Sequence, residues 1–316
     1  MRVGLVTPIY EGVHSNPGSE MITAGIRYLV RQAIKGPEFV QIDMLRDNAA
    51  HWSAAQDCDA LIICGNPRFS TCATEWWESG IWERLVAAQR SGVRVIDGWA
   101  GATHWYDPAA TLEEMATRIA SHGANAEAMH SAKQIHARIT RDRLMQRIYS
   151  DAGASSTLLP CSSWWARLDV PWEQAAKRSG TAVVLGTHDM DWPLDCVRAC
   201  LGRLEGADVI SCALSDYERF GAVGVRSTLV SDPAALLRLY SSLDRVLSFR
   251  LHAAIPAASV GCAVGMVATD SRPMACEEFG IPTIDIGDLM DREPPFAHAR
   301  QPDEEDVVEI LRSMLC

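Results

Sequence analysis

Short, continuous runs of apolar residues alternate along the chain with longer stretches of helical periodicity. In the first half, the apolar runs predict strands at Val3–Thr7, Phe39–Asp43, Ala60–Cys64, Val93–Asp97, Gln134–Arg138 and Thr157–Pro160. The stretches between them predict helices, among them Glu20–Lys35, Glu75–Arg90 and Thr111–His122. Buried parallel strands are apolar throughout and are joined by amphipathic helices, so this order predicts a parallel sheet covered by helices on both faces.

A second series of the same kind follows in the other half of the chain. Its predicted strands are Ala182–Gly186, Asp208–Cys212, Val225–Val230, Arg245–Ser248, Val264–Ala268 and Thr283–Ile286. The segment between the two series, Cys161–Gly180, is rich in Trp, Pro and charge without a clear period, and we predict it to be the linker and hinge. We therefore expect an α/β protein with two Rossmann-like domains, residues 1–165 and 166–316. Ligands are expected beyond the C-terminal ends of the strands.

Composition and charge narrow the class of protein. A chain of 316 residues is long enough for two domains, and a net charge of −11 argues against a nucleic-acid partner. The chain starts directly in a predicted strand, and no apolar run reaches the roughly 18 residues that span a bilayer, so we expect a cytoplasmic protein without a membrane segment. The ten cysteines lack the spacing of a zinc or redox site and are expected to be reduced and buried.

The segment Ser248–Cys262 carries the most informative candidate chemistry. Arg250 and His252 stand where the strand Arg245–Ser248 passes into an alanine-rich predicted helix. A helix N-terminus has unpaired N–H groups and partial positive charge, so a permanent cation and an imidazole at this place suit a phosphorylated or carboxylated ligand. The alternative is that Arg250 pairs with an acid and that His252 is a half-buried structural histidine.

The pattern around these residues resembles the polysaccharide pyruvyl transferase family. The resemblance is specific over residues 248–281, where R-L-H-A-A-I-x-A-x-x-x-G is followed by a strand, by D-x-R at Asp270–Arg272 and by a final F-G-I. It is looser at Ile139–Asp142, which resembles the family's central R-D. It is weakest at Ser15–Glu20, which resembles an N-x-G-D-E opening but lacks its Asp.

The resemblance implies a fold, a reaction and a set of site residues. It implies two Rossmann-like domains in a GT-B-like arrangement with an interdomain cleft, and transfer of the pyruvyl group of phosphoenolpyruvate to hydroxyls of a sugar-containing acceptor as a ketal. The implied donor site contains Arg141, Leu251 and His252, with Arg250 as a fourth member. His252 would be the general acid or a phosphate hydrogen-bonding group, and Arg141 would hold an anion unless it forms a salt bridge with Asp142.

The acceptor side and the cofactors are less defined. The acceptor-side candidates, from the opening segment and the loop after the third strand, are Asn16, Glu20, Asn66 and Arg68. No cofactor or metal is expected, because neither G-x-G-x-x-G nor G-x-x-x-x-G-K-[ST] occurs. The polar segment Thr187–Asp191 is interpreted as a loop with a helix cap rather than a metal site.

Two other functions remain open. One is a glycosyltransferase of the same fold that uses a nucleotide sugar; against it, the second half shows no obvious acidic residue paired with a basic diphosphate site. The other is a catalytically silent binding protein that retains the fold. The cations Arg141 and Arg250 and the imidazole of His252 argue against this third function.

Overall fold

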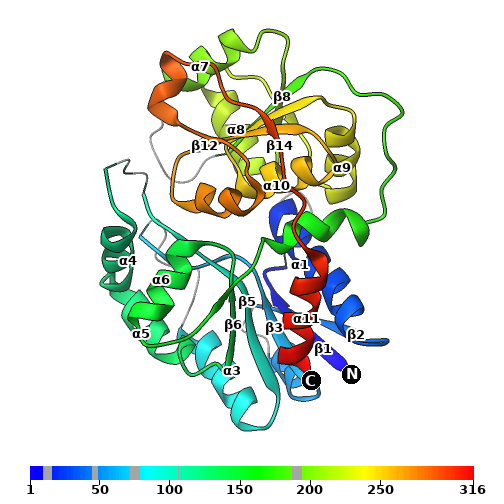
Figure 1. The fold of residues 1–316 in the computed structure, drawn as a ribbon, viewed down its shortest axis with the longest axis vertical. Coiled ribbons are helices and arrows are strands. Elements are labelled where there is room, and N and C mark those ends of the chain that lie inside the picture. The colour runs from blue at the N-terminus through cyan, green and yellow to red at the C-terminus, as the bar shows by residue number, and fades with distance from the viewer. Residues whose placement is uncertain (10–15, 45–48, 72–78, 106, 108, 187–193) are drawn as a thin grey trace. The chain divides into compact units, whose positions relative to one another are not determined.

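The computed structural model describes residues 1–9, 16–44, 49–71, 79–105, 107, 109–186 and 194–316. The predicted loop Thr187–Asp191 and the start of the predicted helix Glu75–Arg90 lie outside the described residues. The chain forms two compact units. Unit 1 comprises Met1–Ile9, Ile26–Ser162 and Asp303–Cys316, and unit 2 comprises Tyr10–Gly25 and Ser163–Pro302 (Figure 1).

Unit 1 is built on a parallel sheet with the strand order β2-β1-β3-β5-β6-β7, and β4 pairs with the end of β5. Its strands are β1 (Arg2–Thr7), β2 (Glu38–Asp43), β3 (Ala60–Cys64), β4 (Pro67–Ser70), β5 (Arg94–Thr103), β6 (Ala137–Thr140) and β7 (Thr157–Leu158). Its helices are α2 (Ala49–Gln56), α3 (Ser79–Arg90), α4 (Leu112–Ala120), α5 (Gly123–Ala132), α6 (Arg143–Asp151) and α11 (Glu304–Leu315). Helix α1 (Pro17–Ala33) begins in unit 2 and ends in unit 1.

Unit 2 is built on a second parallel sheet with the order β10-β9-β8-β11-β12-β13, and β14 pairs antiparallel with β12. Its strands are β8 (Thr181–Leu185), β9 (Asp208–Ser211), β10 (Thr228–Leu229), β11 (Arg245–Ser248), β12 (Ala263–Ala268), β13 (Thr283–Asp285) and β14 (Ala297–His298). Its α-helices after α1 are α7 (Leu194–Arg203), α8 (Leu214–Ala222), α9 (Pro233–Ser241) and α10 (Leu251–Ser259). Its 3-10 helices are η2 (Ser162–Leu168), η3 (Arg272–Phe279) and η4 (Ile286–Met290).

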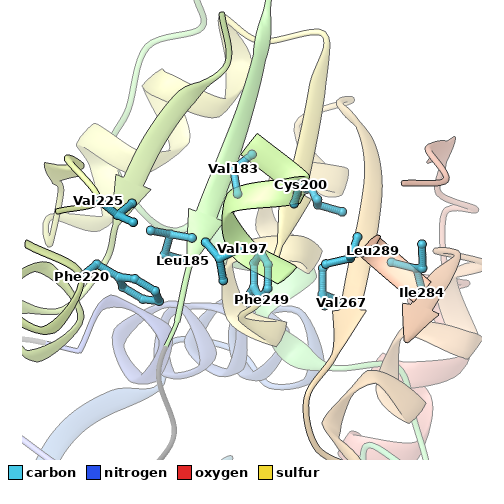
Figure 2. Packing of buried hydrophobic residues seen from close by; sticks show 11 residues of the cluster. Val183, Leu185, Val197, Cys200, Phe220, Val225, Phe249, Val267, Ile284 and Leu289 are labelled. Atoms are coloured by element: carbon cyan, nitrogen blue, oxygen red, sulfur yellow. The ribbon is translucent and has the colours of Figure 1, made fainter. Parts of the chain in front are cut away.

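The core of unit 2 follows from the apolar strands that the sequence predicts. Val183 and Leu185 of β8 and Val267 of β12 are buried in one cluster with Val197 of α7 and with Phe249, which follows β11 (Figure 2). Removing such side chains from water is the main stabilising contribution to folding. This packing fixes the C-terminal ends of β8 and β11, where the candidate site residues begin.

The unit boundaries differ from the predicted domains at both ends of the chain. The segment Asp303–Cys316 was expected in the C-terminal domain but belongs to unit 1. Helix α11 buries Val307, Val308, Leu311 and Leu315 there. Arg312 Nε also donates to the carbonyl of Ala33 at 3.0 Å, and the hydroxyl of Tyr28 donates to Glu304 at 2.8 Å. The amphipathic pattern of a helix predicts that one of its faces is buried. The pattern does not indicate which of the two units that face packs against.

The predicted linker contains one of the four points at which the chain passes between the units, between Ser162 and Ser163. Its first part, residues 161–166, is buried, whereas residues 171–180 are half-buried or exposed and form no helix or strand. Trp164 and Trp165 of η2 are buried, and Trp164 stacks on Phe279 with ring centroids 5.1 Å apart. Tryptophan side chains provide a large apolar area without any periodic pattern, so the absence of a period did not exclude close packing of this first part.

Most of the predicted elements are confirmed, with different bounds. Strand β5 runs on to Thr103 beyond the predicted end at Asp97, and β10 is confined to Thr228–Leu229. Cysteines among the described residues are free, and all except Cys316 are buried. Within the described part of the chain, no helix combines the length and the hydropathy that crossing a membrane requires.

Candidate functional site

Arg250 and His252 lie at the junction of β11 and α10, as the sequence predicts. Arg250 is the N-cap residue of α10, and Leu251 and His252 begin the helix. Ser248 holds the turn from both sides, because its Oγ accepts from the backbone N–H of Arg250 at 3.0 Å and donates to the carbonyl of Arg250 at 2.8 Å. The backbone of His252 departs from helical geometry, with φ −84° and ψ 15°, so the first turn of α10 is kinked at this residue.

The N-terminus of α1 meets this junction inside unit 2. Asn16 caps α1: its side chain accepts from the N–H of Gly18 at 3.1 Å, and its carbonyl accepts from the N–H of Ser19 at 3.0 Å. Pro17 occupies the first helical position, where its missing N–H has no cost. Gly18 lies against His252, since a Cβ at Gly18 would be 2.9 Å from Cβ of His252. Two helix N-termini, each with partial positive charge, therefore converge beside His252.

This arrangement changes the predicted grouping of the site residues. Asn16 and Glu20 were expected on the acceptor side, in the N-terminal domain. Both belong to unit 2, together with Arg250, Leu251 and His252. Asn16 is half-buried as the helix cap, Glu20 is exposed in the first turn of α1, and Leu251 is buried as a core residue. Asn16 therefore caps the N-terminus of α1 beside the candidate anion site.

Arg250 forms an ion pair with Asp216 of α8, a residue that the sequence analysis did not single out. Arg250 Nε donates to Asp216 Oδ2 at 2.7 Å, and Nη2 lies 2.5 Å from the same oxygen. The side chain of Asp216 is fully buried, whereas that of Arg250 is 16% exposed. The expected alternative, Arg250 paired with an acid, is therefore what the structure shows. Asp216 engages one edge of the guanidinium, and Nη1 lies outside this ion pair.

Arg141 and Asp142 lie in unit 1, where β6 passes into α6. The guanidinium of Arg141 is buried against the backbone of Gly101, because a Cβ at Gly101 would lie 2.5 Å from Nε of Arg141. Its Nε is 4.0 Å from Asp142 Oδ2, so the expected salt bridge is long. Asp142 caps α6 by accepting from the N–H of Met145 at 2.7 Å. Burial raises the pKa of the Asp142 carboxyl to about 6, against the opposing effect of Arg141.

Because Arg141 and His252 belong to different units, the prediction that both face one cleft stays a prediction.

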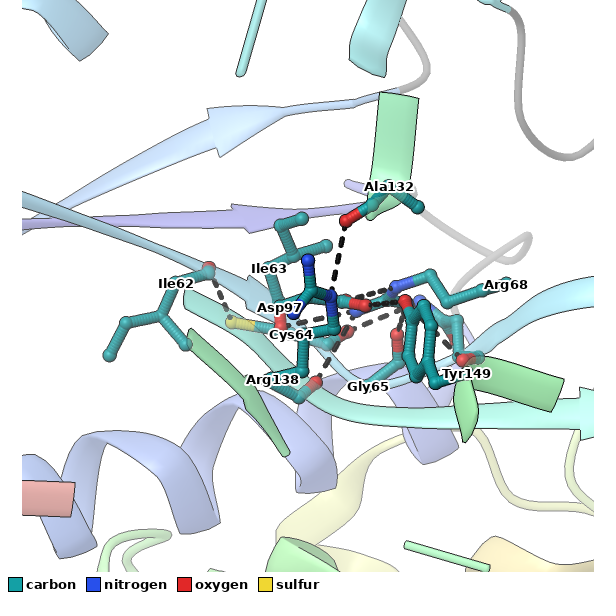
Figure 3. Close-up of polar contacts among 11 residues, drawn as sticks. Ile62, Ile63, Cys64, Gly65, Arg68, Asp97, Ala132, Arg138 and Tyr149 are labelled. Carbon is teal, nitrogen blue, oxygen red and sulfur yellow. Dashed lines mark hydrogen bonds and ion pairs between the residues drawn. The ribbon is translucent and has the colours of Figure 1, made fainter. Parts of the chain in front are cut away.

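Arg68, an acceptor-side candidate, is enclosed in unit 1 (Figure 3). Its Nε donates to Asp97 at 2.7 Å, and its Nη2 donates to the carbonyls of Ile63 at 3.2 Å and Gly98 at 3.3 Å. Nη1 donates to the carbonyl of Gly65. The side chain is fully buried, so it offers no donor to an acceptor in this conformation. These hydrogen bonds stabilise the turn that contains Gly65 and Asn66, both of which have positive φ.

Asn66 remains an acceptor-side candidate at the C-terminal end of β3. It has φ 73°, the left-handed region that asparagine tolerates better than most residues. Its carbonyl accepts from the N–H of Gly101 at 3.2 Å, which ties the turn to β5. Ligands of parallel α/β sheets bind at this edge, so the position of Asn66 fits the prediction without testing it.

The D-x-R of the resemblance is an internal ion pair. Arg272 Nε donates to both carboxylate oxygens of Asp270, at 2.9 and 2.8 Å, and both residues are buried. The following 3-10 helix, η3, ends at Gly280, whose φ of 66° lies in the left-handed region that glycine adopts readily. This pair shapes the turn after β12.

Comparisons with known proteins find similarity in structure only. No family model matches the chain, and no curated protein sequence does. Among solved structures, the UDP-GlcNAc 2-epimerase of Methanocaldococcus jannaschii, in complex with UDP-GlcNAc and UDP, is similar with a TM-score of 0.59 at 6% identity, over 99% of both chains. The MnaA–UDP co-structure from S. aureus is similar with a TM-score of 0.56 at 9% identity, over 98% of this chain and 90% of the other.

A putative UDP-N-acetylglucosamine 2-epimerase from Listeria monocytogenes is also similar, with a TM-score of 0.55 at 8% identity over 99% of this chain and 90% of the other. At such identities the likeness shows the fold alone. It extends along nearly the whole chain and confirms the predicted class of two Rossmann-like α/β domains. Fold likeness does not carry residue roles, which depend on the site itself.

Proposed function

We propose that this protein is an enzyme that binds a nucleotide sugar and transfers its glycosyl group, with unit 2 holding the donor's phosphates where α1 and α10 meet. The observation that carries the proposal is the convergence of Gly18 and His252 at two helix N-termini, beside the Arg250–Asp216 pair. Helix N-termini bind phosphate through their N–H groups and partial charge. An arginine edge adds planar donors that suit phosphate oxygens.

The pairing of Arg250 with a buried acid supports the nucleotide-sugar donor. The objection to this donor was the lack of an acidic residue beside a basic diphosphate site, and Asp216 removes that objection. The fold comparisons support the same class, because the solved structures of similar fold carry UDP or UDP-GlcNAc in their names. In the proposed reaction, the bond between the glycosyl carbon and the phosphate oxygen breaks, an acceptor hydroxyl bonds to that carbon, and the hydroxyl proton passes to a base.

Pyruvyl transfer from phosphoenolpyruvate is the second candidate. The observation that favours it is the R-L-H segment, with Arg250 and His252 at a strand–helix junction, where the sequence resembles the pyruvyl transferase family. In this reaction C3 of the enol gains a proton and C2 is attacked by one hydroxyl. Phosphate then leaves, and a second hydroxyl closes the ketal. His252 would donate the C3 proton or hydrogen-bond the phosphate, since an imidazole titrates near neutral pH.

One set of measurements separates these functions. Thermal unfolding is followed with UDP, UDP-GlcNAc, a GDP-sugar and phosphoenolpyruvate, because a ligand that binds only the folded state raises Tm. We expect a rise with a nucleoside diphosphate or its sugar. A rise with phosphoenolpyruvate alone would replace glycosyl transfer by pyruvyl transfer.

Turnover distinguishes both transferases from a silent binding protein. The chain is incubated with each donor and a panel of sugar acceptors, and release of nucleoside diphosphate or of inorganic phosphate is measured. We expect nucleoside diphosphate to be released only when an acceptor is present. Isomerisation of UDP-GlcNAc without an acceptor would assign an epimerase, and binding without any product would assign a binding protein.

A further inference from the structure

Gly186, directly after β8, leaves room for the side chain of Arg250. A Cβ at Gly186 would lie 3.0 Å from Nε and 3.1 Å from Cδ of Arg250, and well inside van der Waals distance of Cγ. The aliphatic part of Arg250 therefore occupies the space that any side chain at Gly186 would need. Because φ of Gly186 is not in the left-handed region, the close approach of Arg250 and not backbone strain requires a glycine here.

Asp216 holds the other end of the same side chain. Its buried carboxylate receives Nε and Nη2 of Arg250, and Ser248 fixes the backbone of Arg250 through two hydrogen bonds. A free arginine side chain samples many rotamers, and immobilising one costs up to about 2 kcal/mol of conformational entropy. In this unit that ordering is completed by folding, before any ligand is bound.

We propose that Gly186 and Asp216 are positioning residues for Arg250: they hold the guanidinium so that its Nη1 edge is presented to the donor's phosphate. The inference rests on the proposed function, which assigns Arg250 to that phosphate. Gly186 acts by leaving space and Asp216 by engaging one edge of the guanidinium. Neither residue touches the donor.

The test is Gly186→Ala, which keeps both charges and displaces only the stem of Arg250. Dissociation constants for UDP, phosphoenolpyruvate and inorganic pyrophosphate are measured by calorimetry. Loss of a charge-assisted hydrogen bond weakens binding by roughly 10- to 100-fold, and we expect this loss for Gly186→Ala and equally for Arg250→Ala. The double variant should bind no more weakly than Arg250→Ala, because both changes remove the same contact.

Gly202→Ala is the matched control. Gly202 is in α7 of the same unit, and a Cβ there meets nothing within 4 Å, so the same substitution should leave binding unchanged. Wild-type affinity in Gly186→Ala, together with a loss in Arg250→Ala, would overturn the proposal. Losses that multiply in the double variant would overturn it too.

A second variant covers the case in which Gly186→Ala does not fold. Arg250→Lys keeps the positive charge but lacks Nε and the planar fork, so it should lose most of the affinity. Wild-type affinity in Arg250→Lys would show that orientation of the guanidinium does not matter, and the proposal would fall.

A measurement without ligand separates this inference from the proposed function. A wild-type chain that binds none of the three probes refutes the proposed function. Exchange of the Nε–H proton of Arg250, followed by NMR, then decides the positioning role. Slow exchange in the wild type and fast exchange in Gly186→Ala support that role, and equal exchange rates overturn it.

Discussion

Two arginine–aspartate pairs, one in each unit, have the same central contact but different surroundings. In unit 1 Arg68 Nε donates to Asp97 at 2.7 Å, and in unit 2 Arg250 Nε donates to Asp216 at the same distance. Around Arg68 the remaining donors reach backbone carbonyls and the side chain is fully buried, whereas the side chain of Arg250 is 16% exposed. The comparison shows that the surroundings of the guanidinium, rather than its acid partner, decide whether the arginine is enclosed or partly open to solvent.

The largest effect is expected where the enclosed pair is broken. Asp97→Ala leaves the guanidinium of Arg68 buried without its carboxylate and removes the partner of the Tyr149 hydroxyl. Removing one partner of a buried ion pair costs about 3–5 kcal/mol, so we expect a loss of that size in the free energy of unfolding, measured in urea.

The control for this prediction is an exposed ion pair of the same unit. Asp107→Ala removes the partner of Arg118, a pair whose side chains are 35% and 51% exposed. Water screens a pair this exposed, so we expect a much smaller loss of stability in Asp107→Ala than in Asp97→Ala. Equal losses in Asp97→Ala and Asp107→Ala would show that enclosure of Arg68 has no energetic consequence.

The next effect concerns chemistry beside Arg250. If His252 transfers a proton in the rate-limiting step, His252→Ala should lower kcat by roughly two to four powers of ten. Donor binding should fall much less, because Arg250 and the helix N-termini remain. The measurement is kcat and Kd for the donor that supports turnover. Unchanged kcat would return His252 to the role of a half-buried structural histidine.

Another buried arginine–aspartate pair, Arg141–Asp142, sharpens the comparison through pH. Burial raises the pKa of Asp142 to about 6, above its ordinary value of 3.8. A raised carboxyl pKa contributes stability below the ordinary pKa, and that contribution is lost as pH rises through the folded value. The window is therefore about pH 4 to 6, and the loss is of order 3 kcal/mol.

Asp142→Asn tests this directly, because asparagine keeps an oxygen that can accept from Met145 and caps α6 without titrating. Unfolding free energies of both proteins are measured from pH 4 to 7. We expect the difference between wild type and variant to shift against the wild type as pH rises. A difference that stays constant would mean that Asp142 has an ordinary pKa.

The smallest effect is expected at the backbone of Arg250. Ser248→Ala removes the hydroxyl that bonds both the N–H and the carbonyl of Arg250, at a cost of about 1 kcal/mol in stability. The ion pair with Asp216 stays in place, so we expect the Kd for the donor to change by less than about threefold. A loss of affinity as large as that of Arg250→Ala would make Ser248 part of the positioning device.

The predicted strands and the junction at Arg250 and His252 followed from local patterns in the sequence. The cap at Asn16 could have been predicted too, because Asn followed by Pro is typical of a helix N-terminus. The partners Asp97 and Asp216 were out of reach, because they lie 29 and 34 positions from their arginines and the choice of partner is made by tertiary packing. For the same reason the sequence did not indicate that the side chain of Arg68, which follows a short turn, is fully buried.

The return of α11 to unit 1 has a consequence for synthesis on the ribosome. Domains generally fold as units while the chain emerges. Unit 1 begins at Met1 but lacks Val307, Leu311 and Leu315 until α11 has been translated. The unit that is started first is thus completed last, and a nascent chain halted at Pro302 would contain all of unit 2 beside an unfinished unit 1.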